Sequence, residues 1–163
     1  SKSWNNRVNV TADTQNDILK IAVIERHKAS GNIGLGFVKG FGLKTGAIAS
    51  TIAHDSHNMI VIGTNDDDMY YAANQLVKSQ GGKIIVENGK TLAQLKLPIA
   101  GLMSEEPAEI VMEKLQTLEK TASDIGCKIN DPFMSMAFLS LSVIPEIKIT
   151  IDVGKFEVTN LFE

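Results

Sequence analysis

Short apolar runs rich in β-branched residues recur along the chain and predict buried strands. Three of these runs cover residues 19–24, 47–53 and 59–62. Two further runs, at residues 83–87 and 91–97, flank the dipeptide Asn88–Gly89. This dipeptide readily adopts the positive φ angles of a tight turn, so the two runs are predicted to form a β-hairpin.

Apolar positions spaced three and four residues apart predict two long amphipathic helices. The first opens with the acidic triplet Asp66–Asp68, which Thr64 or Asn65 can cap, and it ends before Gly81–Gly82. Acidic side chains favour the positive end of the helix dipole, so we interpret the triplet as helix capping rather than a metal site. The buried face of this helix is expected to comprise Met69, Ala72, Ala73, Leu76 and Val77.

The second long helix is predicted to begin near Ser104 and to end at Gly126. A segment at 133–141 follows the helix-start signal Asp131–Pro132 and is apolar on nearly every side, which predicts a short buried helix. Two C-terminal strands are expected at residues 147–151 and 155–158. Together these elements indicate one compact domain over residues 1–163, of the α/β (mixed α+β) class with a mixed sheet.

Six glycines between Gly31 and Gly46 interrupt the first half of the chain. Because glycine readily adopts positive φ angles, we interpret this stretch as turns or bulges between short strands. The glycine spacing departs from that of a dinucleotide-binding loop, and no Gly-Lys-Ser/Thr motif follows it, so phosphate binding is disfavoured.

The composition narrows the range of functions. The 16 basic and 19 acidic residues give a net charge of −3, which argues against a nucleic-acid partner. Cys127 is the single cysteine, which excludes an internal disulfide and a multi-cysteine metal centre, and a reducing, cytoplasmic location is expected. No apolar run approaches the roughly 18 residues of a membrane span, so no membrane partner is expected. The chain does not begin with Met, and we expect it to be part of a longer polypeptide.

The most polar stretch beside an apolar run is AHDSHN, at residues 53–58. His54, Asp55 and His57 are the candidate functional side chains. Three interpretations are open: a polar turn whose histidines bond to the backbone or a neighbouring domain, a surface that faces a ligand, or a metal-binding pair. A protein metal site needs about three or four ligands, and this stretch supplies two or three.

The run IGLGFVKGFGLKTGAIASTIAHDSHNMIVIGT, at residues 33–64, closely resembles the C-terminal domain of bacterial adenine deaminases, members of the amidohydrolase superfamily. Three later segments resemble the same family in the same order: LPIAGLMS at 97–104, PFMSMAFLSL at 132–141 and VIPEIKIT at 143–150. The resemblance extends over essentially the entire chain. Ser142 departs from the family pattern, in which proline is expected before VIP.

The resemblance implies a hydrolase that converts adenine and water to hypoxanthine and ammonia in purine catabolism, with manganese or iron activating the water. The superfamily holds its metal in a (β/α)₈ barrel of about 250 residues, with ligands that begin at an H-x-H pair. This chain has no H-x-H pair and is too short for a barrel. The resemblance therefore places the metal and the catalytic residues elsewhere in the full-length enzyme, and it assigns no catalytic residue here.

We expect this domain to cover the barrel of its own polypeptide or to support the interface of a homo-oligomer. His54, Asp55 and His57 are expected to face the purine pocket or the barrel. Two alternatives are a free-standing ligand-binding or assembly module without catalytic activity, and a chain that binds its own metal at the histidines.

Overall fold

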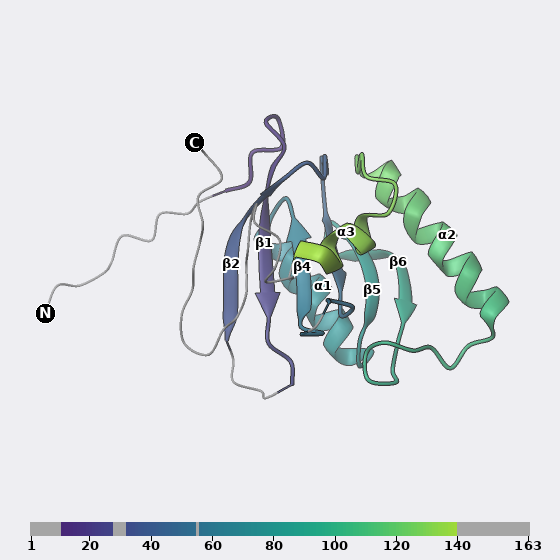
Figure 1. The fold of residues 1–163 in the computed structure, drawn as a ribbon. Coiled ribbons are helices and arrows are strands. Elements are labelled where there is room, and N and C mark those ends of the chain that lie inside the picture. The colour runs from purple at the N-terminus through teal and green to yellow at the C-terminus, as the bar shows by residue number, and fades with distance from the viewer. Residues whose placement is uncertain (1–10, 28–31, 55, 140–163) are drawn as a thin grey trace, which may run out of the picture.

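Six strands form one sheet in the described part of the chain, and helices lie on both of its faces (Figure 1). The computed structural model describes residues 11–27, 32–54 and 56–139. The strands are β1 (Ile18–Ile24), β2 (Ile33–Lys39), β3 (Ala47–Ser50), β4 (Met59–Gly63), β5 (Gly82–Glu87) and β6 (Lys90–Lys96). Their order is β2-β1-β4-β3-β5-β6, and each neighbouring pair runs antiparallel.

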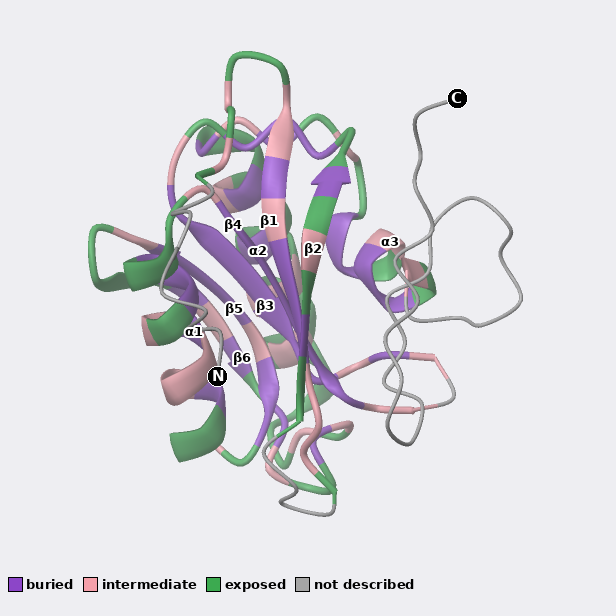
Figure 2. Ribbon diagram, turned by 90° about the vertical axis from the view of Figure 1, so that its left-hand side faces the viewer, coloured by how far each residue is buried: buried purple, intermediate pink, exposed green. Residues whose placement is uncertain are grey.

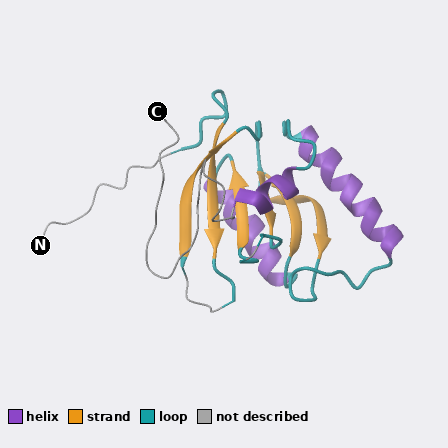
Figure 3. Cartoon of the chain, in the orientation of Figure 1, coloured by secondary structure: helices purple, strands orange, loops and turns teal. Residues whose placement is uncertain are grey.

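The helices divide between the two faces of this sheet, as Figure 3 shows. Helix α1 (Asp66–Lys78) packs on β3, β4 and β5. On the opposite face, α2 (Ala108–Asp124) covers β5 and β6, and α3 (Pro132–Leu139) contacts β3. The strands β1 and β2 therefore lie largely outside the area that α1 covers.

Alternating side chains divide the interior into two cores. Along β3, Ala47 and Ala49 belong to the cluster that contains Leu76 of α1, whereas Ile48 belongs to the cluster that contains Leu118 of α2. This division follows from the strand period of two, which directs successive side chains to opposite faces. The central strands are consequently buried on both sides, as the colouring of Figure 2 shows.

The locally encoded elements are confirmed. The strands at 19–24 and 59–62 form as expected, and Asn88 and Gly89 adopt φ angles of 52° and 68° in the hairpin turn. Asn65 caps α1, because its side chain accepts a hydrogen bond from the Asp68 amide at 2.8 Å. Asp131 caps α3 by accepting from the Met134 amide at 2.9 Å.

The glycine-rich stretch differs from the prediction. Instead of short strands broken by turns, β2 runs without interruption through Gly34 and Gly36, which pair with Val23 and Ile21 of β1. The alternating apolar residues of β2 provide the strand pattern, and the intervening glycines obscured it. The predicted turns with positive φ begin after the strand, at Gly40.

Three further details differ from the expectations. The strand predicted at 47–53 ends at Ser50, whose hydroxyl accepts from the Ile52 amide and so starts a turn. Val77 is 67% exposed, because it lies one residue, or about 100°, beyond buried Leu76 on α1. The mixed α/β class is confirmed. The sheet was expected to combine parallel and antiparallel strands, but all of the described strand pairs are antiparallel.

Part of the prediction falls outside the described residues, namely the two C-terminal strands and residues 140 and 141 of the short helix. Among the helices that the structure describes, none combines the length and the apolar character needed to cross a membrane.

Candidate functional site

The residues between β3 and β4, which we call the 51–58 turn, carry the histidines singled out in the sequence. The turn is bent back on itself by two backbone hydrogen bonds. The His57 amide donates to the Ala53 carbonyl at 3.0 Å, and the Ser56 amide donates to the His54 carbonyl at 2.8 Å. His57 has a φ of 47°, a left-handed conformation that is uncommon for residues other than glycine. The histidines thus lie on a sharply folded turn at one end of the sheet.

Arg26, which follows β1, holds this turn from the side of the neighbouring strand. Its Nε donates to the His57 carbonyl at 2.5 Å, and its Nη2 donates to the Ala100 carbonyl at 2.6 Å. Burial lowers the pKa of Arg26, yet a guanidinium stays protonated at neutral pH. One cation therefore bridges two loops that are far apart in the sequence.

The loop around Ala100 and Gly101 approaches Arg26 closely. A Cβ atom at Gly101 would lie 2.5 Å from Nη1 of Arg26, and Gly101 has a φ of +73°, so both space and conformation favour glycine. Thr51 fixes the same loop, because its hydroxyl donates to the Gly101 carbonyl at 2.7 Å and accepts from the Gly82 amide at 2.9 Å. The start of the 51–58 turn is thus joined to β5 and to this loop.

The two histidine rings have different surroundings. The ring of His54 contacts the ring of Phe138 on α3 with centroids 4.4 Å apart, and the His54 amide donates to the Ala137 carbonyl at 3.1 Å. Nδ1 of His57 is buried and has no hydrogen-bond partner among the residues that the structure describes. A neutral imidazole offers one donor and one acceptor, so His57 retains a hydrogen-bonding capacity that the described fold does not use.

The sequence therefore located the turn correctly, whereas the role of its side chains stays a prediction. The structure places His54 against α3 and His57 beside Arg26, and Asp55 lies outside the described residues. Within residues 11–27, 32–54 and 56–139, no group of three or more His, Cys, Asp or Glu side chains is arranged to hold a metal ion.

Sequence reasoning missed Arg26 and Thr51. The carbonyls that Arg26 binds are 31 and 74 residues away, and the glycine carbonyl that Thr51 binds is 50 residues away. No local periodicity or short motif reports such contacts. The only available signal was indirect: an arginine directly after a predicted buried strand lies at the same sheet end as the turn that precedes an antiparallel neighbouring strand.

Comparison with known proteins identifies the family. Residues 2–161 match the family described as the adenine deaminase C-terminal domain. The chain is 54% identical over 156 residues to an adenine deaminase from Desulfatibacillum aliphaticivorans, covering 93% of this chain and 27% of that protein. It is 53% identical over 152 residues to an adenine deaminase from Brucella abortus strain 2308, covering 91% of this chain and 26% of that protein.

An adenine deaminase from Clostridium botulinum strain ATCC 19397 is 49% identical over 157 residues, or 94% of this chain and 26% of that protein. The chain thus spans about a quarter of the length of the curated relatives it matches. With a family match over nearly its whole length and about half of its residues identical to those relatives, the chain belongs to the adenine deaminase C-terminal domain family.

Proposed function

We propose that this chain is the C-terminal domain of a metal-dependent adenine deaminase. The full-length enzyme is a hydrolase that converts adenine and water to hypoxanthine and ammonia. The observation that carries this proposal is the identity of about one half, over nine tenths of the chain, to proteins named adenine deaminase. The single cysteine fits a reducing compartment, and we place the enzyme, as a homo-oligomer, in the cytoplasm.

The described residues do not fit a resident metal. They contain no group of three or more potential ligands, and the sequence contains no H-x-H pair. We therefore assign the divalent metal, manganese or iron, to the remainder of the full-length polypeptide. The contribution of this domain is then one of positioning.

The domain's contribution is proposed to come from the 51–58 turn. His54, Asp55 and His57 face the purine pocket or the barrel of the same polypeptide. Two features support this role: the turn is anchored by Arg26, and the buried Nδ1 of His57 has no described partner. A buried polar atom without a partner costs about 1–3 kcal/mol. Because Nδ1 is buried, a small shift of the turn on assembly would expose it, and a hydrogen bond from the purine or from a barrel group would then recover this cost.

The test is made in the full-length enzyme, with His54→Ala, Asp55→Ala and His57→Ala prepared one at a time. The expected result is a loss of kcat/KM for adenine of about tenfold or more with unchanged metal content. Asp67→Ala is the control, since Asp67 is exposed at the start of α1, which follows the end of β4 opposite to the 51–58 turn. Unchanged kinetics and unchanged metal content in all three variants of the turn would remove its proposed role.

A further inference from the structure

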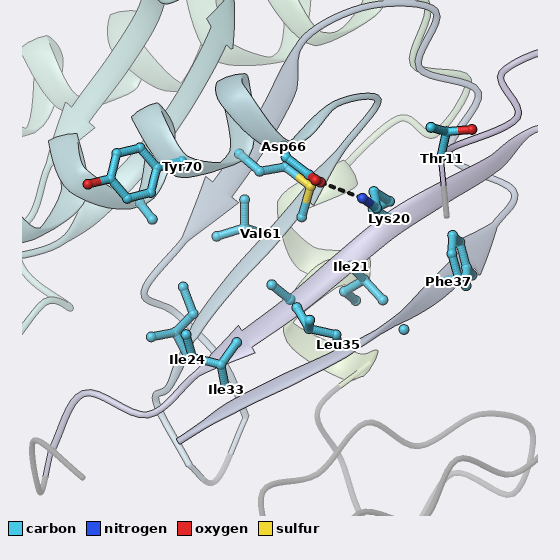
Figure 4. A pocket seen from close by; sticks show the side chains of 14 residues that line it. Thr11, Lys20, Ile21, Ile24, Ile33, Leu35, Phe37, Val61, Asp66 and Tyr70 are labelled. Atoms are coloured by element: carbon cyan, nitrogen blue, oxygen red, sulfur yellow. Dashed lines mark hydrogen bonds and ion pairs between the residues drawn. The ribbon is translucent and has the colours of Figure 1, made fainter. Parts of the chain in front are cut away.

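An apolar groove lies beside α1, over the outer strands β1 and β2 (Figure 4). Its volume is about 570 Å³. The floor is formed by Ile33, Leu35 and Phe37 of β2 with Ile24 of β1, and Tyr70 of α1 stands along one side. The groove is separate from the 51–58 turn described above, none of whose residues line it.

The groove exists because of the sheet order. Strand β2 pairs with β1 so that Leu35 lies opposite Ala22 and Ile33 lies opposite Ile24, which directs these side chains toward the α1 face. Helix α1 covers β3, β4 and β5 instead, so this end of the face has no helix over it in the described part of the chain. Leu35 is 67% exposed as a result. Strand β2 is the outermost strand of the described sheet, and an apolar outermost strand is typical of an interaction surface.

The chemistry of the groove suits a protein surface better than a small molecule. Small-molecule sites enclose most of the ligand and direct several polar groups at it. Here Leu35 and Tyr70 are mostly exposed, so a bound small molecule would stay in contact with solvent. The ion pair between Lys20 and Asp66 lies at one end, and the remaining lining is dominated by apolar side chains.

We propose that the groove is the docking surface for the part of the full-length polypeptide that precedes this chain. The inference rests on the proposed function in taking the chain as the C-terminal part of a longer enzyme. The matched relatives extend beyond it by about three quarters of their length, and the family is described as a C-terminal domain. A preceding portion of that size is large enough to cover the groove.

The N-terminal end of the described chain lies at the groove, which favours a preceding part of the same polypeptide over a separate protein as its partner. Thr11, the first described residue, itself lines the groove. The 10 residues before it can span at most about 35 Å even when fully extended. A part of the same polypeptide that precedes Thr11 is tethered at the groove, and tethering through a short linker raises the effective concentration to about the millimolar range. A surface with only weak intrinsic affinity then suffices for stable docking.

The groove also leads toward the candidate site. Its Ile24–Ile33 end is the end of the sheet at which Arg26 binds the 51–58 turn. Ile24 also pairs with Met59, the first residue of β4 after that turn. A single neighbouring domain seated in the groove is therefore brought next to the sheet end that carries His57.

The test compares two engineered thiols in the full-length enzyme, Leu35→Cys and Val77→Cys. Both positions are 67% exposed in this domain, and Val77 does not line the groove, so it is a matched control. Labelling by a small water-soluble maleimide is followed peptide by peptide with mass spectrometry. The Leu35→Cys variant is expected to react at least about tenfold more slowly than the Val77→Cys variant. In the 163-residue chain alone the two variants are expected to react at similar rates.

Three results would overturn the proposal. Equal labelling of the two variants in the full-length enzyme would show that the groove is open. Protection of the Leu35→Cys variant in the 163-residue chain would show that a segment of this chain fills it. Protection that disappears on dilution would assign the groove to a second copy. Adenine deamination is measured on the same samples. An active enzyme whose Leu35→Cys thiol is not protected would refute the docking surface alone. An inactive enzyme whose Leu35→Cys thiol is protected would refute the proposed function alone.

Discussion

Arg26 and Gly101 offer a quantitative test of how the 51–58 turn is held in place. Replacing Arg26 by alanine removes two charge-assisted hydrogen bonds, to the carbonyls of His57 and Ala100. Hydrogen bonds to charged groups contribute about 1.5–3 kcal/mol each when buried, and Arg26 is only partly buried. We therefore expect Arg26→Ala to lower the free energy of unfolding by about 2–3 kcal/mol in total.

Gly101→Ala perturbs the same contact from the other side. Its new Cβ would lie 2.5 Å from Nη1 of Arg26, so the guanidinium must leave its position. Alanine at the observed φ of +73° adds about 1–2 kcal/mol of conformational cost. The single variant is therefore expected to lose about 3–5 kcal/mol, which combines this cost with the loss of the Arg26 contacts.

The double variant separates the two costs. Once Arg26 is alanine, Gly101→Ala is expected to cost only the conformational part, which leaves a coupling of about 2–3 kcal/mol between the two sites. The assay is urea unfolding of the chain, with equal m-values required for the comparison. Lys20→Met is the control, because it removes an ion pair whose Asp66 side chain is 75% exposed. It should lower the free energy of unfolding by less than about 1 kcal/mol, and its effect should be additive with that of Gly101→Ala. Additivity of Arg26→Ala and Gly101→Ala within about 0.5 kcal/mol would refute this description of the turn.

Two further predictions concern Asp68 and Cys127. The buried carboxylate of Asp68 accepts hydrogen bonds from the amides of Asn88 and Gly89 at 3.2 and 2.8 Å, so Asp68→Ala should lower the free energy of unfolding in urea by about 2–4 kcal/mol. Asp67 is exposed, and Asp67→Ala should change this free energy by less than about 0.5 kcal/mol. Equal effects of the two substitutions would contradict the role of Asp68 in holding the hairpin turn. Burial raises the pKa of Cys127 above its usual 9.0, so above about that pH the unfolded thiol ionises while the folded thiol keeps its proton, and stability falls. Urea unfolding at pH 7.5 and pH 10 should show a larger loss for the parent chain than for Cys127→Ala, and identical losses would contradict the raised pKa.

What could be predicted from the sequence is what neighbouring residues determine. Asn88–Gly89 sets the hairpin turn by its own φ preferences, and Asn65 caps α1 from within the same helix turn. Such signals act over a few residues, so one sequence is enough to recognise them. The acidic triplet was interpreted as capping for this reason, and its third member proves to hold the turn between β5 and β6 as well.

What could not be predicted depends on the order of the strands. Sequence periodicity does not say that β1 lies between β2 and β4, and that order decides which surface α1 leaves uncovered. The groove was missed because the glycines of β2 obscured the alternation of Ile33, Leu35 and Phe37. The hydrogen bonds of Arg26 to the carbonyls of His57 and Ala100 were missed because these residues are distant from Arg26 in the sequence.

The most direct test of the central claim is ammonia release from adenine by the purified 163-residue chain, measured beside the full-length polypeptide with manganese or iron supplied to both. We expect the full-length polypeptide to release ammonia and form hypoxanthine in equal amounts, and the chain alone to release none. Sustained deamination of adenine by the chain alone would contradict the assignment of the metal and the reacting groups to the rest of the enzyme.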